Sequence, residues 1–342
     1  EGMAPPQKIL FSPEKIFMDW QQRQRAGAGL YKLGDTRFLN SILQCLTYTP
    51  PLANYLLSRE HSQSCHQQGF CMMCRMEAHV NKVLHSSDSA IQPWDVLSVL
   101  SRIGIHFELG VLADALEFLC CTVSAMQTAC LSGRSNLDTS SQLTTVVQQI
   151  FVGFLRSRVT CSSCNMTTNF YKTFLDISLD IKAASSVTAD LENFVTPEQL
   201  DGENCFKCSQ QGAFQHWALC LVSWCDKMVA ASKSLTVHHA PKVLMVCLER
   251  AEDFTDRKIS KVVEYPECLD LRPYTSQAAG EPLLYCLYAV LVHSSDSYNE
   301  GHYYCYTKAS NGLWYKMDDM SVHYCDIDTV LRQQAYLLFY VR

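Results

Sequence analysis

Residues 27–46, GAGLYKLGDTRFLNSILQCL, hold the most informative pattern in the chain. A glycine-rich loop leads to Asp35 and Thr36, both good helix N-cap residues, and the apolar residues that follow recur at helical spacing. The pattern predicts a helix that begins near Arg37. Free N–H groups and the helix dipole at such an N-terminus stabilise anions and lower the pKa of a cysteine thiol placed there. The start of this helix is therefore a candidate site for chemistry.

The composition limits the class of protein. The chain has 342 residues, of which 48% are hydrophobic, enough to bury a large core in one big domain or two smaller ones. A net charge of −6 argues against nucleic acid as the main partner, because binding phosphates needs a basic surface. The sequence has neither a long apolar run nor the layout of a signal peptide, so we expect no membrane association and a cytoplasmic or nuclear location.

The periodicity of the sequence changes near residue 150. The region before it is mostly helical in pattern, whereas the region after it contains segments rich in β-branched and aromatic residues: FYKTFLDISLDI, KVLMVCLER, LLYCLYAVLVHS, HYYCYTKA, LWYKMDD and AYLLFYVR. Helices first and strands later predict an α+β fold. Residues 1–28, with several prolines and a polar QQRQR run, are expected to form an extension that packs loosely, if at all.

The opening segment resembles the cysteine box of the ubiquitin-specific proteases, G-L-x-N-L-G-N-T-C-F-L-N-S-x-L-Q-C-L. The matching residues are Gly29, Leu30, Leu33, Gly34, Thr36, Phe38, Leu39, Asn40, Ser41, Leu43, Gln44, Cys45 and Leu46. QCLTYTPPLANYL, residues 44–56, is similar to the branch of the family that contains ubiquitin carboxyl-terminal hydrolases 36 and 42. Two positions depart from the box. Arg37 stands where the family has its nucleophilic cysteine, and Asp35 stands where it has the asparagine that helps hold the oxyanion.

These two departures bear directly on the activity that the resemblance implies. Arginine stays protonated in proteins and has no lone pair with which to attack a carbonyl. Asp35 would place a negative charge where an oxyanion must form, and loss of the oxyanion donor alone costs about 10²–10³ in rate. Cys45 is no substitute, because eight residues along a helix separate it from position 37 by about 12 Å. We expect Asp35 to offset the charge of Arg37 through a local ion pair.

Two later segments resemble further parts of the family's site. Asp114 lies in DALEFL, which is similar to the box whose aspartate receives the tail of ubiquitin, although Leu112 and Leu116 replace polar residues there. GHYYCY and WYKMDD are predicted strands joined by a turn at Asn311-Gly312. The resemblance assigns His302 as the general base, Asp318 as the residue that orients it, and Tyr303 to tail binding.

The cysteines suggest metal sites rather than disulfides, because eighteen thiols in a long chain without a signal peptide indicate a reducing compartment. The pairs Cys161-x2-Cys164 and Cys205-x2-Cys208 form the stronger candidate, since two such turns can hold one structural zinc ion. The resemblance leaves Cys225 as an alternative ligand, with Cys208 as its partner. No catalytic cofactor is expected.

A second cluster, Cys65, His66, Cys71 and Cys74, has the pattern C-H-x4-C-x2-C. Four soft ligands at this spacing could bind zinc. Only one C-x2-C pair is present, however, so the sequence favours thiols packed beneath a helix.

Taken over residues 29–342, the resemblance implies an α+β, papain-like fold of the ubiquitin-specific protease type. It implies a helical thumb at about 29–150, fingers at about 151–250 and a palm completed by 251–342. The leading hypothesis is a catalytically inactive protein that binds ubiquitin or a ubiquitinated partner. One alternative is an active, cysteine-type deubiquitinase, and another is a zinc-stabilised scaffold without affinity for ubiquitin.

Overall fold

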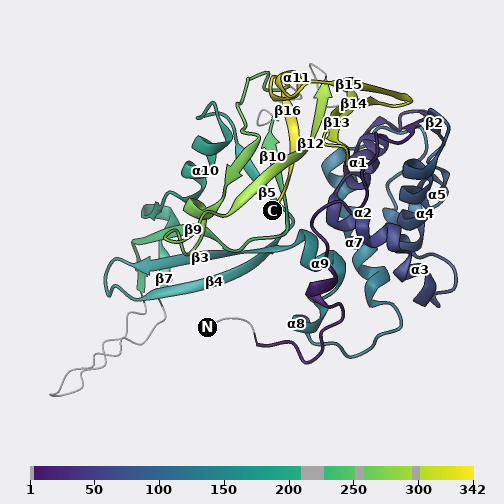
Figure 1. The fold of residues 1–342 in the computed structure, drawn as a ribbon. Coiled ribbons are helices and arrows are strands. Elements are labelled where there is room, and N and C mark those ends of the chain that lie inside the picture. Colours follow the sequence, from purple (N-terminus) through teal and green to yellow (C-terminus); the bar gives the residue numbers. More distant parts are fainter. Residues whose placement is uncertain (1–3, 209–226, 251–257, 295–300) are drawn as a thin grey trace.

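The helices of the first half of the chain form one body (Figure 1). The structure, a computed structural model, describes residues 4–208, 227–250, 258–294 and 301–342. The helices are α1 (Arg37–Thr47), α2 (Pro50–Ser58), α3 (Glu60–Ser64), α4 (Met72–His85), α5 (Trp94–Leu97), α6 (Leu100–Ile103), α7 (Ala115–Leu131), α8 (Thr139–Gln142) and α9 (Val146–Phe151). All residues of α1 after Arg37 are buried, because this helix packs between the other helices and the large sheet.

The large sheet has the strand order β15-β14-β13-β12-β16-β10-β5, and β11 pairs with β12. Its strands are β5 (Asp176–Asp180), β10 (Val243–Glu249), β11 (Cys268–Asp270), β12 (Leu284–Ser294), β13 (His302–Lys308), β14 (Trp314–Asp318), β15 (Ser321–Cys325) and β16 (Ala335–Val341). Successive side chains of β10 enter two different cores. Met245 joins the core shared with the helices, and Leu244 and Val246 join the core on the opposite face.

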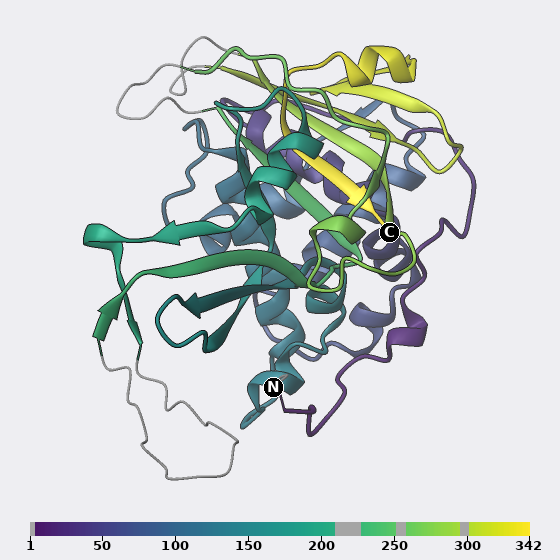
Figure 2. The ribbon, with the colours of Figure 1, turned by 90° about the vertical axis from the view of Figure 1, so that its left-hand side faces the viewer.

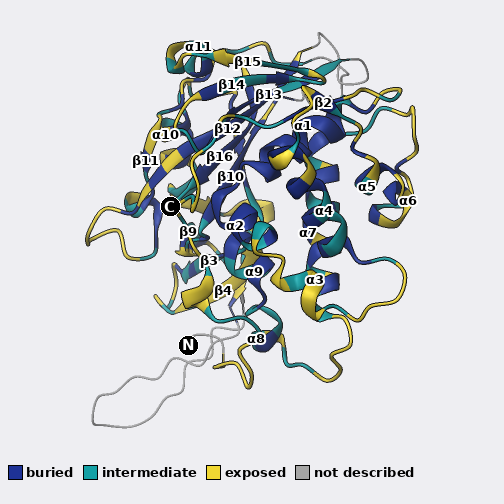
Figure 3. Cartoon of the chain, turned by 45° about the vertical axis from the view of Figure 1, so that its right-hand side comes forward, coloured by how far each residue is buried: buried dark blue, intermediate teal, exposed yellow. Residues whose placement is uncertain are grey.

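Burial on both faces explains why the central strands are almost continuously apolar (Figure 3). The arrangement confirms the predicted α+β class. Among the described residues, no helix has both the length and the apolar character needed to cross a membrane.

A second, smaller sheet has the order β4-β3-β9-β6 and extends away from the large one (Figure 2). The remaining elements are β1 (Gly29–Leu30), β2 (Ala90–Ile91), β3 (Gly153–Cys161), β4 (Thr167–Phe174), β6 (Glu198–Leu200), β7 (Phe206–Cys208), β8 (Lys227–Val229), β9 (Ala231–His239), α10 (Val187–Val195) and α11 (Ile327–Leu331). The segment predicted as fingers, 151–250, is divided between the two sheets, because β5 and β10 belong to the large one.

The N-terminal extension is packed against the helical body, contrary to the expected loose packing. Phe11 donates its amide to the Thr144 carbonyl at 3.1 Å, and its ring meets that of Tyr55 edge-on at 5.2 Å. The side chain of Asn54 donates two hydrogen bonds, 2.8 Å each, to carbonyls of the extension. The proline-rich composition of residues 1–28 did not predict these hydrogen bonds.

A buried arginine fixes the end of β10. Arg250 is fully buried, and its Nε donates to the Ala335 carbonyl at 2.7 Å. Its Nη1 donates to the carbonyls of Ile259 and Lys261 at 3.1 and 2.7 Å. The guanidinium therefore joins the ends of β10 and β16 to the segment that follows residue 258.

Candidate functional site

His302 and Asp318 meet on the β13–β14 hairpin. Gly312 takes φ +81° in the connecting turn, a conformation that favours glycine. Cys305 pairs with Met317, so continuing the register places Asp318 diagonally opposite His302 on one face. The His302 Nε2 and the Asp318 Oδ1 lie 2.7 Å apart, and the two side chains are 28% and 30% exposed. The structure thus brings together the predicted base and its orienting carboxylate.

The next residue, Asp319, points to a different set of partners. It lies in the two-residue turn between β14 and β15 with φ +50°, a conformation that aspartate tolerates. Its Oδ2 accepts from the Arg37 Nε at 3.1 Å, and its Oδ1 accepts from the Asn40 Nδ2 at 2.9 Å. Its main-chain carbonyl accepts from the Leu30 amide at 2.9 Å. Asp318 and Asp319 therefore belong to two separate sets of contacts, the first with His302 and the second with the start of α1.

Arg37 is the first residue of α1, as the sequence predicts, but its partner differs from the expected one. Within the described part of the chain its ion pair is with Asp319, and Asp35 is exposed. The Arg37 side chain is 31% exposed and that of Asp319 12%, so this pair is better shielded from water than one with Asp35 would be. The expectation of an Asp35–Arg37 pair is therefore wrong. In the sequence, the second aspartate of Asp318-Asp319, at the end of a predicted strand, could have indicated this partner.

The loop before α1 lies directly against the same turn. Gly29 and Leu30 form β1, which pairs with β2. A Cβ atom at Gly29 would lie 2.4 Å from the Met320 carbonyl oxygen, so only glycine permits this approach. The glycine loop, the start of α1 and the β14–β15 turn therefore form one continuous structure.

Replacing Asp319 should destabilise the protein. We expect Asp319→Asn, which suits the same backbone conformation, to lower the free energy of unfolding by about 1–3 kcal/mol. The Arg37 and Asn40 side chains both donate to the carboxylate, whereas an amide has one acceptor oxygen and would turn its N–H group toward the other donor. Urea unfolding followed by fluorescence measures the change. Arg37→Met is the matched control and should cost less, since it leaves the Asn40–Asp319 hydrogen bond intact. An equal or larger loss for Arg37→Met would contradict this assignment.

Asp114 and Tyr303 lie in different surroundings. Asp114 caps α7 by accepting from the Glu117 amide at 2.9 Å, and it accepts from the Tyr336 hydroxyl at 2.8 Å. Burial, together with the Asp114 carboxylate, raises the pKa of Tyr336, so this hydroxyl remains a donor. Tyr303 is only 2% exposed, and its ring stacks on that of His293 at 4.2 Å. The Tyr303 side chain therefore lies beneath the surface, and its assignment to tail binding stays a prediction.

The nearest alternative thiol is inaccessible. Cys45 is completely buried in α1, and burial, reinforced by Cys305, raises its pKa well above the ordinary value. A buried neutral thiol is a poor nucleophile. The structure therefore supports the exclusion of Cys45 as a substitute.

Three of the four predicted finger thiols come together. The Sγ atoms of Cys161, Cys164 and Cys208 lie within 4.8 Å of one another, a donor set that suits zinc. Cys205 is not a member of this group. It lies immediately before β7, at the end of the short 3-10 helix Gly202–Asn204. The inclusion of Cys205 is therefore corrected, while the alternative ligand, Cys225, lies outside the described residues.

The other cysteine cluster also assembles, with a different histidine. His61, Cys65, Cys71 and Cys74 place their ligand atoms within 4.8 Å of one another, whereas His66 is exposed and is not part of the group. His61 lies one helical turn before Cys65, and this i, i+4 spacing puts both on one side of α3. The choice of His66 is therefore corrected to His61, and whether the thiols bind a metal stays open to test.

Sequence comparison places these features among known proteins. The pattern of the family described as "Ubiquitin carboxyl-terminal hydrolase" matches residues 28–340. Human ubiquitin carboxyl-terminal hydrolase 42 is 54% identical over 342 residues, which are 100% of this chain and 25% of that protein. Human ubiquitin carboxyl-terminal hydrolase 17-like protein 11 is 46% identical over the same length, 61% of that protein. The chain therefore spans only part of the length of these curated relatives.

Solved structures share the fold. A chain of the SAGA DUB module bound to monoubiquitin has a TM-score of 0.79 and 27% identity, covering 99% of this chain and 71% of that one. A chain of the SAGA Ubp8/Sgf11/Sus1/Sgf73 DUB module bound to ubiquitin aldehyde has a TM-score of 0.80 and 27% identity, covering 96% and 72%. The similarity extends across both the helical body and the sheets.

Proposed function

Because the chain belongs to the ubiquitin carboxyl-terminal hydrolase family and has the predicted α+β, papain-like fold of the ubiquitin-specific protease type, we propose that it binds ubiquitin or a ubiquitinated partner without hydrolysing it. One observation carries the proposal. The first residue of α1, where the cysteine box of the family has its nucleophile, is Arg37, held by Asp319 at 3.1 Å.

The chemistry of the site follows from this substitution. Acyl transfer in the family requires a thiolate that attacks the carbonyl. The guanidinium of Arg37 has no lone pair to donate and cannot form an acyl intermediate. His302, oriented by Asp318 at 2.7 Å, retains the geometry of a general base but has no thiol at position 37 to deprotonate. The imidazole–carboxylate pair is therefore a remnant that supports the shape of the cleft.

Binding is supported by other observations. The solved structures with the same fold are complexes with monoubiquitin and with ubiquitin aldehyde. Asp114, at the position of the tail-binding aspartate, is half-buried at the start of α7, where its carboxylate can accept further hydrogen bonds. The thumb, fingers and palm proposed for 29–150, 151–250 and 251–342 would then form the ubiquitin-binding surface. The cytoplasmic or nuclear location stays a prediction.

We expect no hydrolysis of a ubiquitin-amide reporter by the purified chain. The same sample should bind ubiquitin in a titration, which separates an inactive binder from a scaffold without affinity for ubiquitin. The control is His302→Ala, prepared in parallel. Turnover above a mock purification that disappears in His302→Ala would show an active deubiquitinase with another nucleophile. Absence of both turnover and binding would favour the scaffold.

A further inference from the structure

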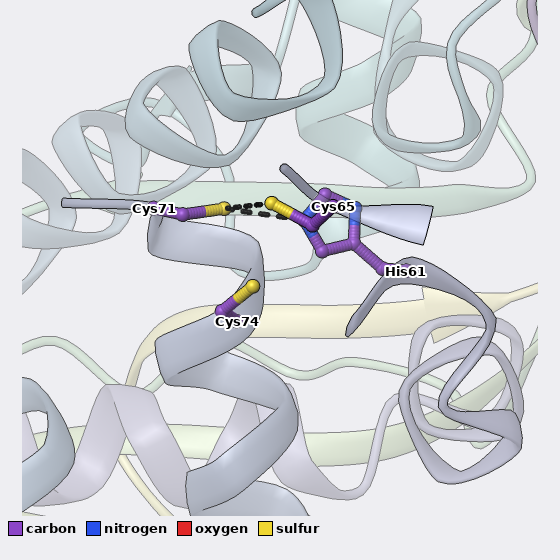
Figure 4. Close-up of side chains that lie close together, drawn as sticks. All are labelled: His61, Cys65, Cys71 and Cys74. Atoms are coloured by element: carbon purple, nitrogen blue, oxygen red, sulfur yellow. Dashed lines mark hydrogen bonds between the residues drawn. The ribbon is translucent and has the colours of Figure 1, made fainter. Parts of the chain in front are cut away.

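Four potential ligands converge at the junction between α3 and α4 (Figure 4). His61 lies in α3, and Cys65 follows the last residue of that helix. Cys71 is the N-cap of α4, and Cys74 lies in the first turn. The chain supplies all four from a span of fourteen residues, 61–74, so their positions depend on local backbone geometry.

The distance between two of the sulfur atoms matches that of a tetrahedral metal site. The Sγ atoms of Cys65 and Cys71 are 3.8 Å apart, and the His61 Nε2 lies 3.1 Å from the Cys71 Sγ. In a tetrahedron with bonds of about 2.1–2.3 Å, ligand atoms lie roughly 3.5–3.8 Å from one another. The Cys65–Cys71 distance lies in this range, and the His61–Cys71 distance is shorter, as in a hydrogen bond. A disulfide would instead require an S–S separation of about 2.05 Å. The geometry therefore fits thiols gathered around a cation better than an oxidised pair.

Two features of the local structure are consistent with a metal ion at this place. The five residues of α3 include none that is buried, so this short helix depends on polar contacts: Ser62 donates to the Glu77 carboxylate, and Lys15 pairs with Glu60 at 3.2 Å. The Cys71 side chain makes no capping hydrogen bond to α4 and points toward the cluster instead. A metal ion would join α3 to α4 and would account for both features.

We propose that His61, Cys65, Cys71 and Cys74 bind a structural Zn²⁺ ion, separate from the cluster of Cys161, Cys164 and Cys208. Three thiolates and one imidazole are a preferred ligand set for zinc. Four protein ligands leave no position for substrate or water, so the ion is structural. It fixes α3 beside the groove of about 460 Å³ that Leu10, Phe11 and His61 line, where the N-terminal extension crosses the helices.

A measurement on the unmodified chain tests the site without any variant. Cysteine alkylation is mapped by mass spectrometry before and after a zinc chelator is added. Cys65, Cys71 and Cys74 should react at least about tenfold faster after chelation, because zinc-bound thiolates are protected. Exposed Cys268 and buried Cys45 are internal references for fast and slow reaction. Equal rates with and without chelator, or peptides joined through a disulfide, would overturn the proposal.

Substitutions in each cluster test whether the zinc is bound by His61, Cys65, Cys71 and Cys74. Zinc content after dialysis against a weak chelator should fall by one equivalent in His61→Ala and should not change in His66→Ala. Cys161→Ser, which removes a finger thiol, should retain the chelator-dependent protection of Cys65, Cys71 and Cys74. If His61→Ala fails to fold, cobalt substitution of the unmodified chain and of Cys161→Ser gives the answer, through an intense thiolate-to-cobalt absorption band. A folded His61→Ala that keeps the full zinc content would refute the ligand set.

Discussion

Arg37→Cys alone should give little or no turnover of a ubiquitin-amide substrate, and adding Asp35→Asn should raise the rate by about 10²-fold or more. The first change places a thiol at the start of α1, in the register of the family's nucleophile. The second restores a neutral donor where the oxyanion develops. Nucleophile and oxyanion donor act as one unit, so the two effects should be strongly non-additive.

The structure adds a reason for the weakness of the single variant. When Arg37 is removed, the Asp319 carboxylate loses its ionic partner and keeps an uncompensated negative charge beside the start of α1. A nearby negative charge disfavours a thiolate. Leu112 and Leu116 also differ from the polar residues of the family near the cleft, so even the double variant should be slow.

Labelling by a ubiquitin probe with a C-terminal electrophile measures the repair directly. Arg37→Cys with Asp35→Asn should label, and addition of His302→Ala should abolish labelling. If both repaired variants stay folded and bind ubiquitin but neither labels, His302 and Asp318 are misplaced relative to position 37. Their interpretation as a retained catalytic pair would then be wrong.

Arg250→Met should be among the most destabilising single substitutions, with a loss of more than about 3 kcal/mol in the free energy of unfolding. The buried guanidinium donates to the carbonyls of Ala335, Ile259 and Lys261, and methionine leaves those acceptors without these donors. The hydrogen bond to Ala335 is buried and the other two are partly buried, and an acceptor that loses its donor away from water costs about 1–3 kcal/mol. Chemical denaturation measures the effect.

Arg272→Met is the matched control for this prediction. Arg272 also donates to main-chain carbonyls, those of Glu281 and Gln277, but at an exposed site. Water replaces the lost donor there, so the loss should stay below about 1 kcal/mol. Similar losses for the two variants would mean that burial of the carbonyls around Arg250 has little energetic effect.

Local patterns predicted the parts of the fold that depend on nearby residues. The start of α1 at Arg37 followed from N-cap residues and helical spacing, and the β13–β14 hairpin followed from Asn311-Gly312. The meeting of His302 and Asp318 also followed, because a hairpin brings its two strands together in a fixed register. The α+β class was predicted from the helical and strand periodicities of the sequence, considered over the whole chain.

Contacts between distant segments could not be predicted from the sequence. The ion pair of Arg37 with Asp319 joins residues 282 positions apart, and only the tertiary fold decides that Asp35 is not the partner. The choice of His61 over His66 depended on whether a short helix formed before Cys65. The absence of Cys205 from the group of Cys161, Cys164 and Cys208 depended on the path of the backbone before β7, which the C-x2-C spacing does not fix.

The contact of Gly29 with the Met320 carbonyl has a consequence for how ligands are received. The glycine loop cannot swing outward without breaking the Leu30–Asp319 main-chain hydrogen bond and the hydrogen bonds from the Asn40 amide to the carbonyls of Leu30 and Tyr31. Loop, helix and turn therefore form a preorganised surface. An incoming polypeptide tail would lose its own conformational freedom on binding there, but the receptor would lose little, so a larger part of the contact energy would appear as affinity.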